Sequence, residues 1–337
     1  MRRKTDAAQH PPRISLICVV LNVAKYIEST IKSVRAQTCG DWELIIIDGT
    51  STDGTQEIVQ KYTKIDPRII FKSEPDEGPW DATEKGMAMA RGEFIMIVAG
   101  QDGFLDNEWL AKCLRILDKD NTISLVWAST RGMHDDGVLF PEKHVSYYHL
   151  THGEGTFDIT RNILQKIFQV GRDLIFGSSI RRKILIKKLF SKTAILKMNF
   201  FTRRMFPGDV SPQREDWFRY WLDTAVPFSE QPMCVAKRVY LDCVSRYPRG
   251  SRIVMDHIMD FHYNFNAKGY LAYYVPTLAG YGRNHPDNSG ARLPEELYSA
   301  TEKYLQKVLA LRKKYLDDHE EMVFIDRVGN EVSRRRF

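Results

Sequence analysis

Short apolar runs alternate with segments of helical periodicity over the first 130 residues, and this alternation restricts the fold more than any other feature. Apolar runs of strand length occur at residues 14–21, 42–47, 68–72, 93–100 and 122–129. Apolar side chains at helical spacing fill the segments between them, at residues 24–37, 51–64, 79–91 and 106–120. Ser51 or Thr52 is expected to cap the second of these helices. Strands that alternate with helices predict an α/β fold with an open, mostly parallel sheet flanked by helices.

Polar residues follow three of the predicted strands at the point where each strand ends. Asn22 follows the first strand and Asp48 the second, while Asp102 follows the fourth in the run "FIMIVAGQDGF". In open α/β sheets, ligands bind in the crevice outside the carboxyl ends of the strands. We therefore expect these three side chains to face a ligand crevice.

The turn after the first strand argues against two common classes of nucleotide-binding enzyme. It reads "VVLNVAKY" and contains no glycine, whereas a dinucleotide-binding fold needs G-x-G-x-x-G at this place. A Walker A loop is absent from the sequence as well. Hydride transfer with a dinucleotide and P-loop chemistry are therefore disfavoured.

Two longer stretches carry a set of motifs in a fixed order. They read "ISLICVVLNVAKYIESTIKSVRAQTCGDWELIIIDGTSTDGT" and "SEPDEGPWDATEKGMAMARGEFIMIVAGQD" and together cover about residues 13 to 130. They resemble the glycosyltransferase family 2 domain, and the second stretch resembles the branch with S-E-P-D-x-G-x-x-D-A-x-x-K-G. The resemblance implies a GT-A fold with a largely helical C-terminal elaboration. It also implies an inverting, metal-dependent transfer of a sugar from a nucleotide-sugar donor to a glycan or lipid-linked acceptor, in surface polysaccharide or glycolipid biosynthesis.

The same resemblance assigns donor-binding roles. Asp48 matches the aspartate that holds the nucleobase, and Asp81 matches a second position that contacts the nucleoside. Lys85 lies one helical turn beyond Asp81, so it is expected either to reach phosphate or to be solvated. Asp53 is expected to serve the turn. The complete set of predicted donor-binding residues is Val20, Leu21, Asn22, Asp48, Asp81, Lys85 and Gln101.

Gln101 and Asp102 fall on the family's metal motif, which usually holds two acidic residues or D-x-D. A divalent cation at this motif bridges the diphosphate, and Mg²⁺ or Mn²⁺ suits oxygen ligands of this kind. Because Gln101 adds no negative charge, Asp102 is the one direct protein ligand that we expect. The alternative is that Gly100 to Gly103 form only a turn.

An inverting enzyme needs a general base that removes the proton of the acceptor hydroxyl. In the family this base is commonly the Asp of an E-D pair on a helix, and Glu215-Asp216-Trp217 opens a predicted helix here. Asp216 is the predicted base, with Asp256 or Asp260 of a second acidic helix as the alternatives. The stretch "KRVYLDCVSRYPRGS", from residue 237, resembles the closing strand and Y-x-R-x-G-S-like ending of these domains.

The sequence suggests three parts. Residues 13–130 are expected to form the nucleotide-sugar-binding core, residues 131–250 the acceptor side, and residues 251–337 a C-terminal helical extension that either packs on the core or mediates a homodimer.

Residues 161–204 hold twelve Lys or Arg residues against one acid, Asp173. Apolar residues at helical spacing lie among them, so this segment either docks on an anionic membrane surface or packs on the protein. It lacks any recognised nucleic-acid reader motif, which argues against a nucleic-acid partner.

The apolar runs and the cysteines of the sequence indicate where the protein is located, and Gln101 motivates a rival function. No apolar run approaches the ~18 residues that cross a bilayer, and the basic N-terminus "MRRKTDAAQHPPR" has no apolar core after it. The odd number of cysteines, five, lacks metal-ligand spacing and predicts reduced thiols. We therefore expect a cytoplasmic protein that is either free or peripheral on the inner face of the membrane. Gln101 also motivates the rival function, a catalytically inactive nucleotide-binding or scaffolding protein of the same fold.

Overall fold

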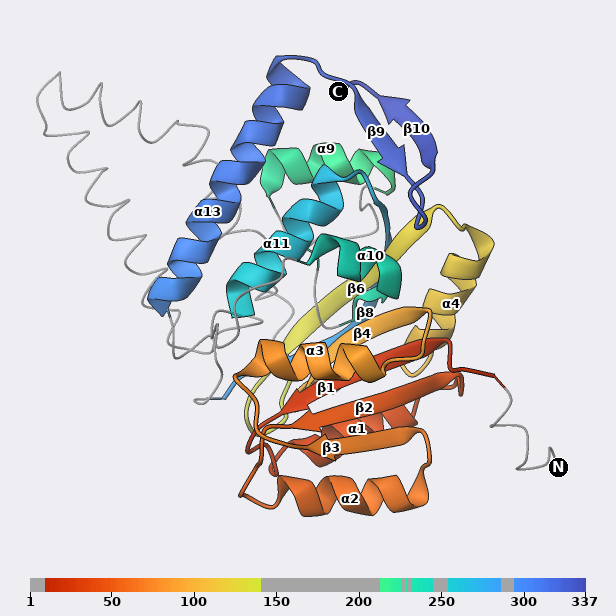
Figure 1. Cartoon of the computed structure of the whole chain (residues 1–337), viewed down its shortest axis with the longest axis vertical. Coiled ribbons are helices and arrows are strands. Elements are labelled where there is room, and N and C mark those ends of the chain that lie inside the picture. Colours follow the sequence, from red (N-terminus) through yellow and green to blue (C-terminus); the bar gives the residue numbers. More distant parts are fainter. Residues whose placement is uncertain (1–9, 141–212, 226–227, 229–231, 245–253, 286–293) are drawn as a thin grey trace, which may run out of the picture.

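The computed structural model describes residues 10–140, 213–225, 228, 232–244, 254–285 and 294–337 (Figure 1). The predicted alternation of the first 130 residues is confirmed. The strands are β1 (Ile14–Val20), β2 (Trp42–Asp48), β3 (Ile69–Ser73) and β4 (Phe94–Ala99), and the helices are α1 (Ile27–Arg35), α2 (Thr55–Ile65), α3 (Pro79–Met89) and α4 (Trp109–Lys119). β2 lies between β3 and β1, and β1 lies between β2 and β4, with every pairing parallel. All seven residues of β2 are buried, as expected for a strand with helices over both faces.

The start of α2 differs from the prediction. The helix begins at Thr55 with Gly54 as its N-cap, and the Asp53 carboxylate accepts the Thr55 N–H at 3.0 Å. The Ser51 hydroxyl is used elsewhere, because it accepts the backbone N–H of Asn22 at 2.7 Å. The capping role expected of Ser51 or Thr52 is therefore wrong. The Ser51 and Asp53 side chains instead join this turn to the turn that follows β1.

The rest of the sheet comes from a longer stretch of the chain. The eight strands lie in the order β3-β2-β1-β4-β7-β6-β8-β5. The remaining four are β5 (Gly103–Phe104), β6 (Ile123–Met133), β7 (Cys234–Ala236) and β8 (Leu271–Arg283). β7 is antiparallel to both β4 and β6, and β8 is parallel to β6. Because the strand direction reverses at β7 and reverses again at β6, β6 and β8 run in the same direction as β1 and β4. For the six strands that run in the same direction, the amino ends therefore lie along one side of the sheet, called here the amino edge, and the carboxyl ends along the other, called here the carboxyl edge.

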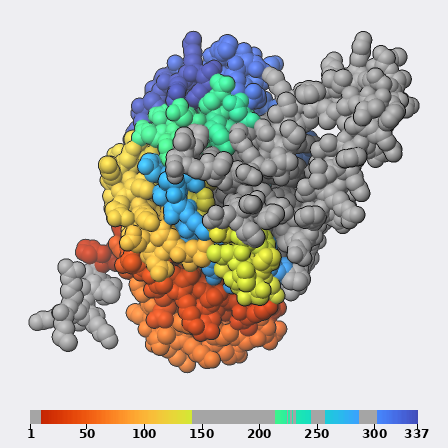
Figure 2. Space-filling view, turned by 180° about the vertical axis from the view of Figure 1, so that it is seen from behind, coloured from red at the N-terminus to blue at the C-terminus, as the bar shows by residue number. Residues whose placement is uncertain are grey.

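The second half of the chain adds helices and a small hairpin. They are α9 (Glu215–Thr224), α10 (Lys237–Cys243), α11 (Val254–Ala267), α13 (Pro294–Arg312), the π-helical turn η4 (Lys313–Asp317), β9 (Met322–Ile325) and β10 (Glu331–Arg335). Figure 1 shows α9, α11 and α13 gathered above the sheet, with the β9–β10 hairpin beside α9. In the space-filling view, the red and orange N-terminal elements form one end of the molecule and the green and blue C-terminal elements form the other (Figure 2).

One expected strand is a helix. Residues 237–243, predicted to begin the closing strand, form α10, and residues 245–253 lie outside the described part of the chain. The long strand of this region is β8, which runs along β6 and ends at Arg283. The pattern Tyr-x-Arg also occurs at the end of β8, in Tyr281-Gly282-Arg283. The closing strand was therefore placed too early in the chain.

Buried aromatic rings join the second half to the sheet. Trp127 of β6 packs edge-on against Trp217 of α9, with ring centroids 5.2 Å apart. The Trp217 indole N–H donates to Asn266 of α11 at 2.8 Å, and the Trp221 indole N–H donates to the Tyr304 hydroxyl of α13 at 2.7 Å. Buried indoles with satisfied N–H groups fix the helices on the sheet.

The described residues contain no helix that is both long and apolar enough to cross a membrane. The five cysteines are free thiols, as predicted, and all but Cys39 are buried.

Candidate functional site

The turns after β1 and β2 are fastened to each other at the carboxyl edge of the sheet. The backbone N–H of Thr52 donates to the Asn22 side-chain oxygen at 2.9 Å, opposite the bond from the Asn22 N–H to Ser51. Asn22 has a left-handed backbone with φ 53°, which Asn tolerates better than most residues. Asp53 accepts the N–H groups of Ala24 and Thr55, a structural role in the turn as expected. The double turn leaves Leu21 57% exposed, whereas Val20 beside it is buried.

Asp48 lies beneath this double turn and is fully buried. Its carboxylate accepts the Ser51 N–H at 3.0 Å and the Ser73 hydroxyl at 2.7 Å. Ser73 ends β3, so Asp48 joins the turns that follow two neighbouring strands. In this arrangement Asp48 shapes the surface on which a nucleoside could lie.

Asp81 and Lys85 form an ion pair on α3. The Lys85 ammonium lies 2.8 Å from the Asp81 carboxylate and also donates to the Pro75 carbonyl at 2.8 Å. The hydrogen bond to Asp81 raises the pKa of Lys85. Asp81 in turn accepts the Glu77 N–H at 3.1 Å. The Lys85 ammonium is therefore bound by Asp81 and by the Pro75 carbonyl, both close to it in the chain. These contacts favour neither of the two roles expected for Lys85, phosphate contact or full solvation.

The Gln101–Asp102 turn follows β4, as predicted. The Asp102 carboxylate is 8% exposed and accepts the backbone N–H of Arg283 at 2.8 Å. The Thr30 hydroxyl donates to the Asp102 carbonyl at 2.6 Å, which fixes the turn on α1. Burial, and to a lesser extent the charge of Asp102, raises the pKa of the nearby Cys18 thiol to about 12. The turn thus holds the Asp102 carboxylate at the carboxyl edge.

The donor set around Asp102 limits the kind of cation site that this edge could form. In the part of the chain that the structure describes, no cluster of three or more Asp, Glu, His or Cys side chains could hold a metal ion. Mg²⁺ takes six oxygen ligands and often binds through one or two carboxylates, substrate phosphates and waters. Asp102 therefore fits a cation that shares its ligands with a diphosphate, and does not fit a cage formed by protein alone.

Arg283, at the end of β8, was missed by the sequence reasoning. It is 9% exposed, and its guanidinium donates to the carbonyls of Gln101, His134 and Asp135, each at 3.3 Å. His134 and Asp135 begin a hairpin after β6, in which the His134 N–H donates to the Val138 carbonyl. The Tyr-x-Arg pattern at the end of β8 was the available signal, but it had been assigned to residues 247–249.

The structure does not bring Asp216 to this edge. The Arg214 backbone N–H donates to the carbonyl of Ala272, near the amino end of β8, and the Asp216 carboxylate pairs with Arg335 at 2.6 Å. The carboxyl end of β8, at Arg283, contacts Asp102. Arg283 is eleven positions beyond Ala272 along the strand, or roughly 35 Å at about 3.3 Å per residue. The E-D pair does open a helix, but that helix meets the opposite edge of the sheet.

The two alternatives to Asp216 lie on α11. Asp260 pairs with Lys307 of α13 at 2.8 Å. Asp256 lies in the first turn of α11, immediately before His257, whose ring stacks on Trp80 with centroids 3.9 Å apart and planes 10° apart. Trp80 precedes Asp81 in the first turn of α3. Of the three predicted bases, Asp256 is therefore the one whose helical turn lies beside the donor-side helix.

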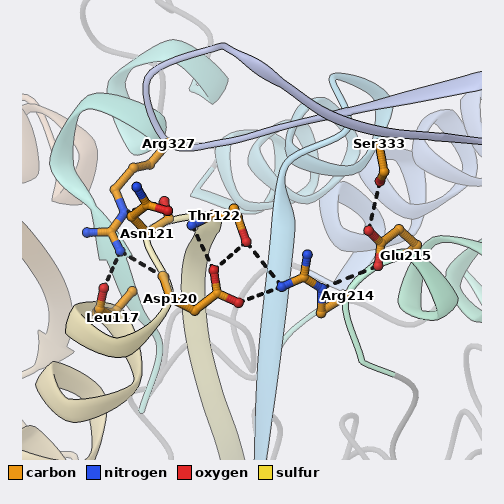
Figure 3. A network of polar contacts seen from close by, with 8 residues as sticks. All are labelled: Leu117, Asp120, Asn121, Thr122, Arg214, Glu215, Arg327 and Ser333. Carbon is orange, nitrogen blue, oxygen red and sulfur yellow. Dashed lines mark hydrogen bonds and ion pairs between the residues drawn. The ribbon is translucent and has the colours of Figure 1, made fainter.

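The amino edge holds a polar network of its own (Figure 3). Arg214 pairs with Asp120 and Glu215, and Glu215 accepts the Ser333 hydroxyl of β10 at 2.8 Å. Arg327, between β9 and β10, donates to the carbonyls of Leu117, Asp120 and Asn121 around the end of α4. Burial by itself raises the pKa of Asp120, but hydrogen bonds from Thr122 and the charge of Arg214 outweigh it and lower the pKa. These contacts lock the C-terminal hairpin to the sheet.

Comparison with known proteins agrees with this geometry. The glycosyl transferase family 2 model matches residues 15–190. The chain belongs to glycosyltransferase family 2. It is 31% identical over 117 residues to a PGL/p-HBAD biosynthesis glycosyltransferase of Mycobacterium tuberculosis, covering 34% of this chain and 46% of the relative. It is 39% identical over 92 residues to the putative teichuronic acid biosynthesis glycosyltransferase TuaG of Bacillus subtilis, covering 27% and 36%. The chain thus spans less than half the length of these family 2 relatives.

The solved structure of S. aureus TarS shares the fold of this family 2 chain. It superposes with a TM-score of 0.52 at 14% identity, covering 90% of this chain and 42% of TarS. At this identity the likeness speaks for the fold alone, and it confirms the predicted GT-A architecture.

Proposed function

We propose that this protein is a glycosyltransferase that moves a sugar from a nucleotide-sugar donor to a glycan or lipid-linked acceptor, with inversion, during surface polysaccharide or glycolipid biosynthesis. The observation that carries the proposal is the gathering of Asn22, Asp48, Asp81 and Asp102 at the carboxyl edge of one sheet. Ligands bind at this edge in open α/β sheets. The two relatives, glycosyltransferases of PGL/p-HBAD biosynthesis and, putatively, of teichuronic acid biosynthesis, support the product class.

The donor is proposed to lie across the turns of this edge. The nucleoside would rest on the double turn of Val20, Leu21 and Asn22, which Asp48 organises from beneath, with Asp81 on its other side. Lys85 would act through Asp81, since the two are paired. The diphosphate would then reach Gln101 and Asp102. A TarS fragment of residues 1–349 has been solved in complex with UDP-GlcNAc, which supports a nucleotide-sugar donor for this fold.

Asp102 is the residue that would hold a divalent cation, Mg²⁺ or Mn²⁺, together with oxygens of the diphosphate. When bound, the cation supplies positive charge to the leaving diphosphate. Gln101 would hydrogen-bond the donor or a bound water without adding charge. The Thr30 and Arg283 contacts hold the Asp102 turn in place while the donor binds.

The base is proposed to come from Asp256 rather than from Asp216 or Asp260. In an inverting transfer the base takes the proton of the acceptor hydroxyl, the hydroxyl oxygen attacks the anomeric carbon, and the nucleoside diphosphate leaves with the electrons of the broken bond. All of these groups must meet at one edge of the sheet. The stack of His257 on Trp80 supports Asp256, whereas the pairs Asp216–Arg335 and Asp260–Lys307 point to structural roles.

The parts of the chain would divide the work. Residues 13–130 would supply the donor side and residues 131–250 the acceptor side. Residues 251–337, expected to be a helical extension, also include β8 of the sheet and would add Asp256 and Arg283 to the site, with a homodimer as a further proposal for this part.

Residues 161–204 lie outside the described residues, so membrane docking rests on their twelve basic residues alone. Attraction to anionic lipid is worth about 1 kcal/mol per basic residue near the surface. The proposed location is the cytoplasm, with the protein either free or peripheral on the inner face of the membrane.

A panel of nucleotide-sugars tests the proposed function. UDP-, GDP- and dTDP-sugars are added with Mn²⁺, and thermal stabilisation and donor hydrolysis are measured together, since a ligand that binds only the folded state raises its stability. The proposal expects one donor class both to stabilise the protein and to be hydrolysed slowly. Stabilisation without any hydrolysis or transfer would favour the rival, an inactive nucleotide-binding protein. No stabilisation by any donor would contradict the function.

A further inference from the structure

We propose that Arg283 is a positioning residue for Asp102, and that its guanidinium sets how tightly this edge takes up a divalent cation with a nucleoside diphosphate. The inference rests on the proposed function and adds a residue to it. Arg283 is not part of the two motif stretches that cover residues 13 to 130, and it enters the site only because β8 returns along β6 to the carboxyl edge.

Arg283 holds the Gln101–Asp102 turn at two points. Its backbone N–H donates to the Asp102 carboxylate at 2.8 Å, and its side-chain Nε–H donates to the Gln101 carbonyl at 3.3 Å. One contact orients the carboxylate and the other orients the peptide next to it. The backbone contact remains in any variant, so a change of the Arg283 side chain is expected to act on the Asp102 oxygens through the Gln101 peptide, without removing the acid.

The guanidinium also joins this turn to the hairpin after β6. Its Nη1 donates to the carbonyls of His134 and Asp135, and the Asp135 carboxylate accepts from Lys25 at 2.7 Å and from the Tyr26 hydroxyl at 2.5 Å. The Tyr26 ring lies 5.3 Å from the guanidinium carbon. Three segments, the Asp102 turn, the hairpin and the start of α1, are thus fixed around one buried cation.

The orientation of the Asp102 carboxylate matters more because Asp102 is the one acid of the Gln101–Asp102 motif. A site with two acids can tolerate a poorly directed oxygen, because the second acid shares the cation. With Gln101 in place of the first acid, the Asp102 oxygens must be directed accurately. Groups that orient a metal ligand typically change metal affinity or activity by 10- to 100-fold when they are removed.

The chain contains a matched arginine for comparison. Arg327 also donates its guanidinium hydrogens to three backbone carbonyls, those of Leu117, Asp120 and Asn121, and its side chain is 13% exposed. It lies at the amino edge, however, at the other end of the strands from Asp102. Removing either guanidinium takes a donor from three backbone carbonyls that are at most partly buried, so the two changes are expected to lower stability similarly. A change in cation requirement is expected only for Arg283.

The experiment uses the full chain and the variants Arg283→Met, Arg283→Lys and Arg327→Met. The probe is whichever of UDP, GDP or dTDP stabilises the wild type most, and the readout is the Mn²⁺ concentration that gives half of its thermal stabilisation. We expect Arg283→Met to raise this concentration by about 10- to 100-fold. Arg283→Lys should fall between Met and wild type, because Lys keeps the charge but loses the planar fork. Arg327→Met should lower the melting temperature and leave the Mn²⁺ requirement at the wild-type value.

The outcomes separate the two proposals. A wild-type Mn²⁺ requirement in Arg283→Met would overturn the role of Arg283 while leaving the proposed function intact. If Arg283→Met does not fold, the same conclusion follows from a wild-type requirement in Arg283→Lys. An equal rise in the Arg327→Met requirement would also overturn the inference, because the effect would then reflect stability alone. A wild type that no nucleoside diphosphate stabilises with Mn²⁺ would contradict the proposed function, and the role of Arg283 with it.

Discussion

At the amino edge of the sheet, carboxylates meet arginines: Asp120 pairs with Arg214, Asp216 with Arg335, and Glu93 with Arg327. At the carboxyl edge, Asp48 accepts from a backbone N–H and a hydroxyl, and Asp102 accepts the backbone N–H of Arg283. Arginine pairs therefore fasten the amino edge. At the carboxyl edge Asp81 pairs with Lys85, but Asp48 and Asp102 accept hydrogen bonds from neutral donors, and these two are the carboxylates proposed to serve the donor and its cation.

The first prediction tests which edge of the sheet supplies the general base. Asp256→Asn should lower transfer by about 10²-fold or more, the usual contribution of a positioned general base, while nucleotide binding survives. Asp216→Asn, at the amino edge, should change transfer little. Steady-state rates for both variants, with nucleotide binding followed by thermal shift, measure the difference.

The reverse result would break the comparison. If Asp216→Asn silences transfer with donor binding intact and Asp256→Asn does not, the amino edge takes part in the chemistry and α9 must approach the donor in the working enzyme.

The second prediction concerns Asp102, the one acid of the Gln101–Asp102 motif. Asp102→Asn should remove cation-dependent nucleotide binding and lower transfer by about 10²-fold, because metal stabilisation of developing charge is worth several kcal/mol. Gln101→Asp should tighten Mn²⁺ binding or change it little. Calorimetric titration of the nucleotide with and without Mn²⁺ distinguishes these effects. Unchanged Mn²⁺-dependent binding in Asp102→Asn would show that another group holds the cation.

The third prediction, with the smallest expected effect, concerns the ion pair between Asp120 and Arg214 at the amino edge. Asp120→Asn should lower the free energy of unfolding by about 1 kcal/mol at pH 7, a modest value because solvent screens a pair in which both side chains are about one-third exposed. The pKa of Asp120 is lowered in the folded protein, so its contribution is complete above the unfolded pKa of about 3.9 and is lost as pH falls through the folded pKa.

Urea unfolding at several pH values checks this sign. The difference between wild type and Asp120→Asn should be largest above about pH 5 and should shrink below about pH 4. A difference that grows on acidification would show that Asp120 is not stabilised as the carboxylate. Transfer activity at pH 7 should remain close to wild type in the folded fraction.

The order of strands and helices in residues 14–133 could be predicted because each element carries its own local pattern. β2 is an unbroken apolar run ended by Asp48, and α3 opens with Pro79. The polar ends of β1, β2 and β4 could be predicted for the same reason, since parallel strands bring their carboxyl ends to one edge. Even the start of α9 at Glu215 follows from the sequence.

The sequence could not tell which edge the later elements meet. Asp216 and Asp256 both lie in the first turn of an acidic helix, and their positions relative to the donor depend on tertiary packing. Arg283 was missed because its contacts with Gln101 and His134 join residues that are 182 and 149 positions apart in the chain. Local patterns carry no information about such distant partners. The paired state of Lys85 likewise depends on how the segment before α3 folds back.

Amide hydrogen exchange with and without nucleotide tests the central claim most directly, namely that the carboxyl edge binds the donor and the amino edge is scaffold. The measurement uses the nucleoside diphosphate that stabilises the protein most, together with Mn²⁺, and compares peptides from the two edges. The account predicts slower exchange at residues 20–24, 49–53 and 100–104 on binding, and unchanged exchange at residues 213–216 and 327–335. Protection at residues 213–216 with none at residues 100–104 would contradict it.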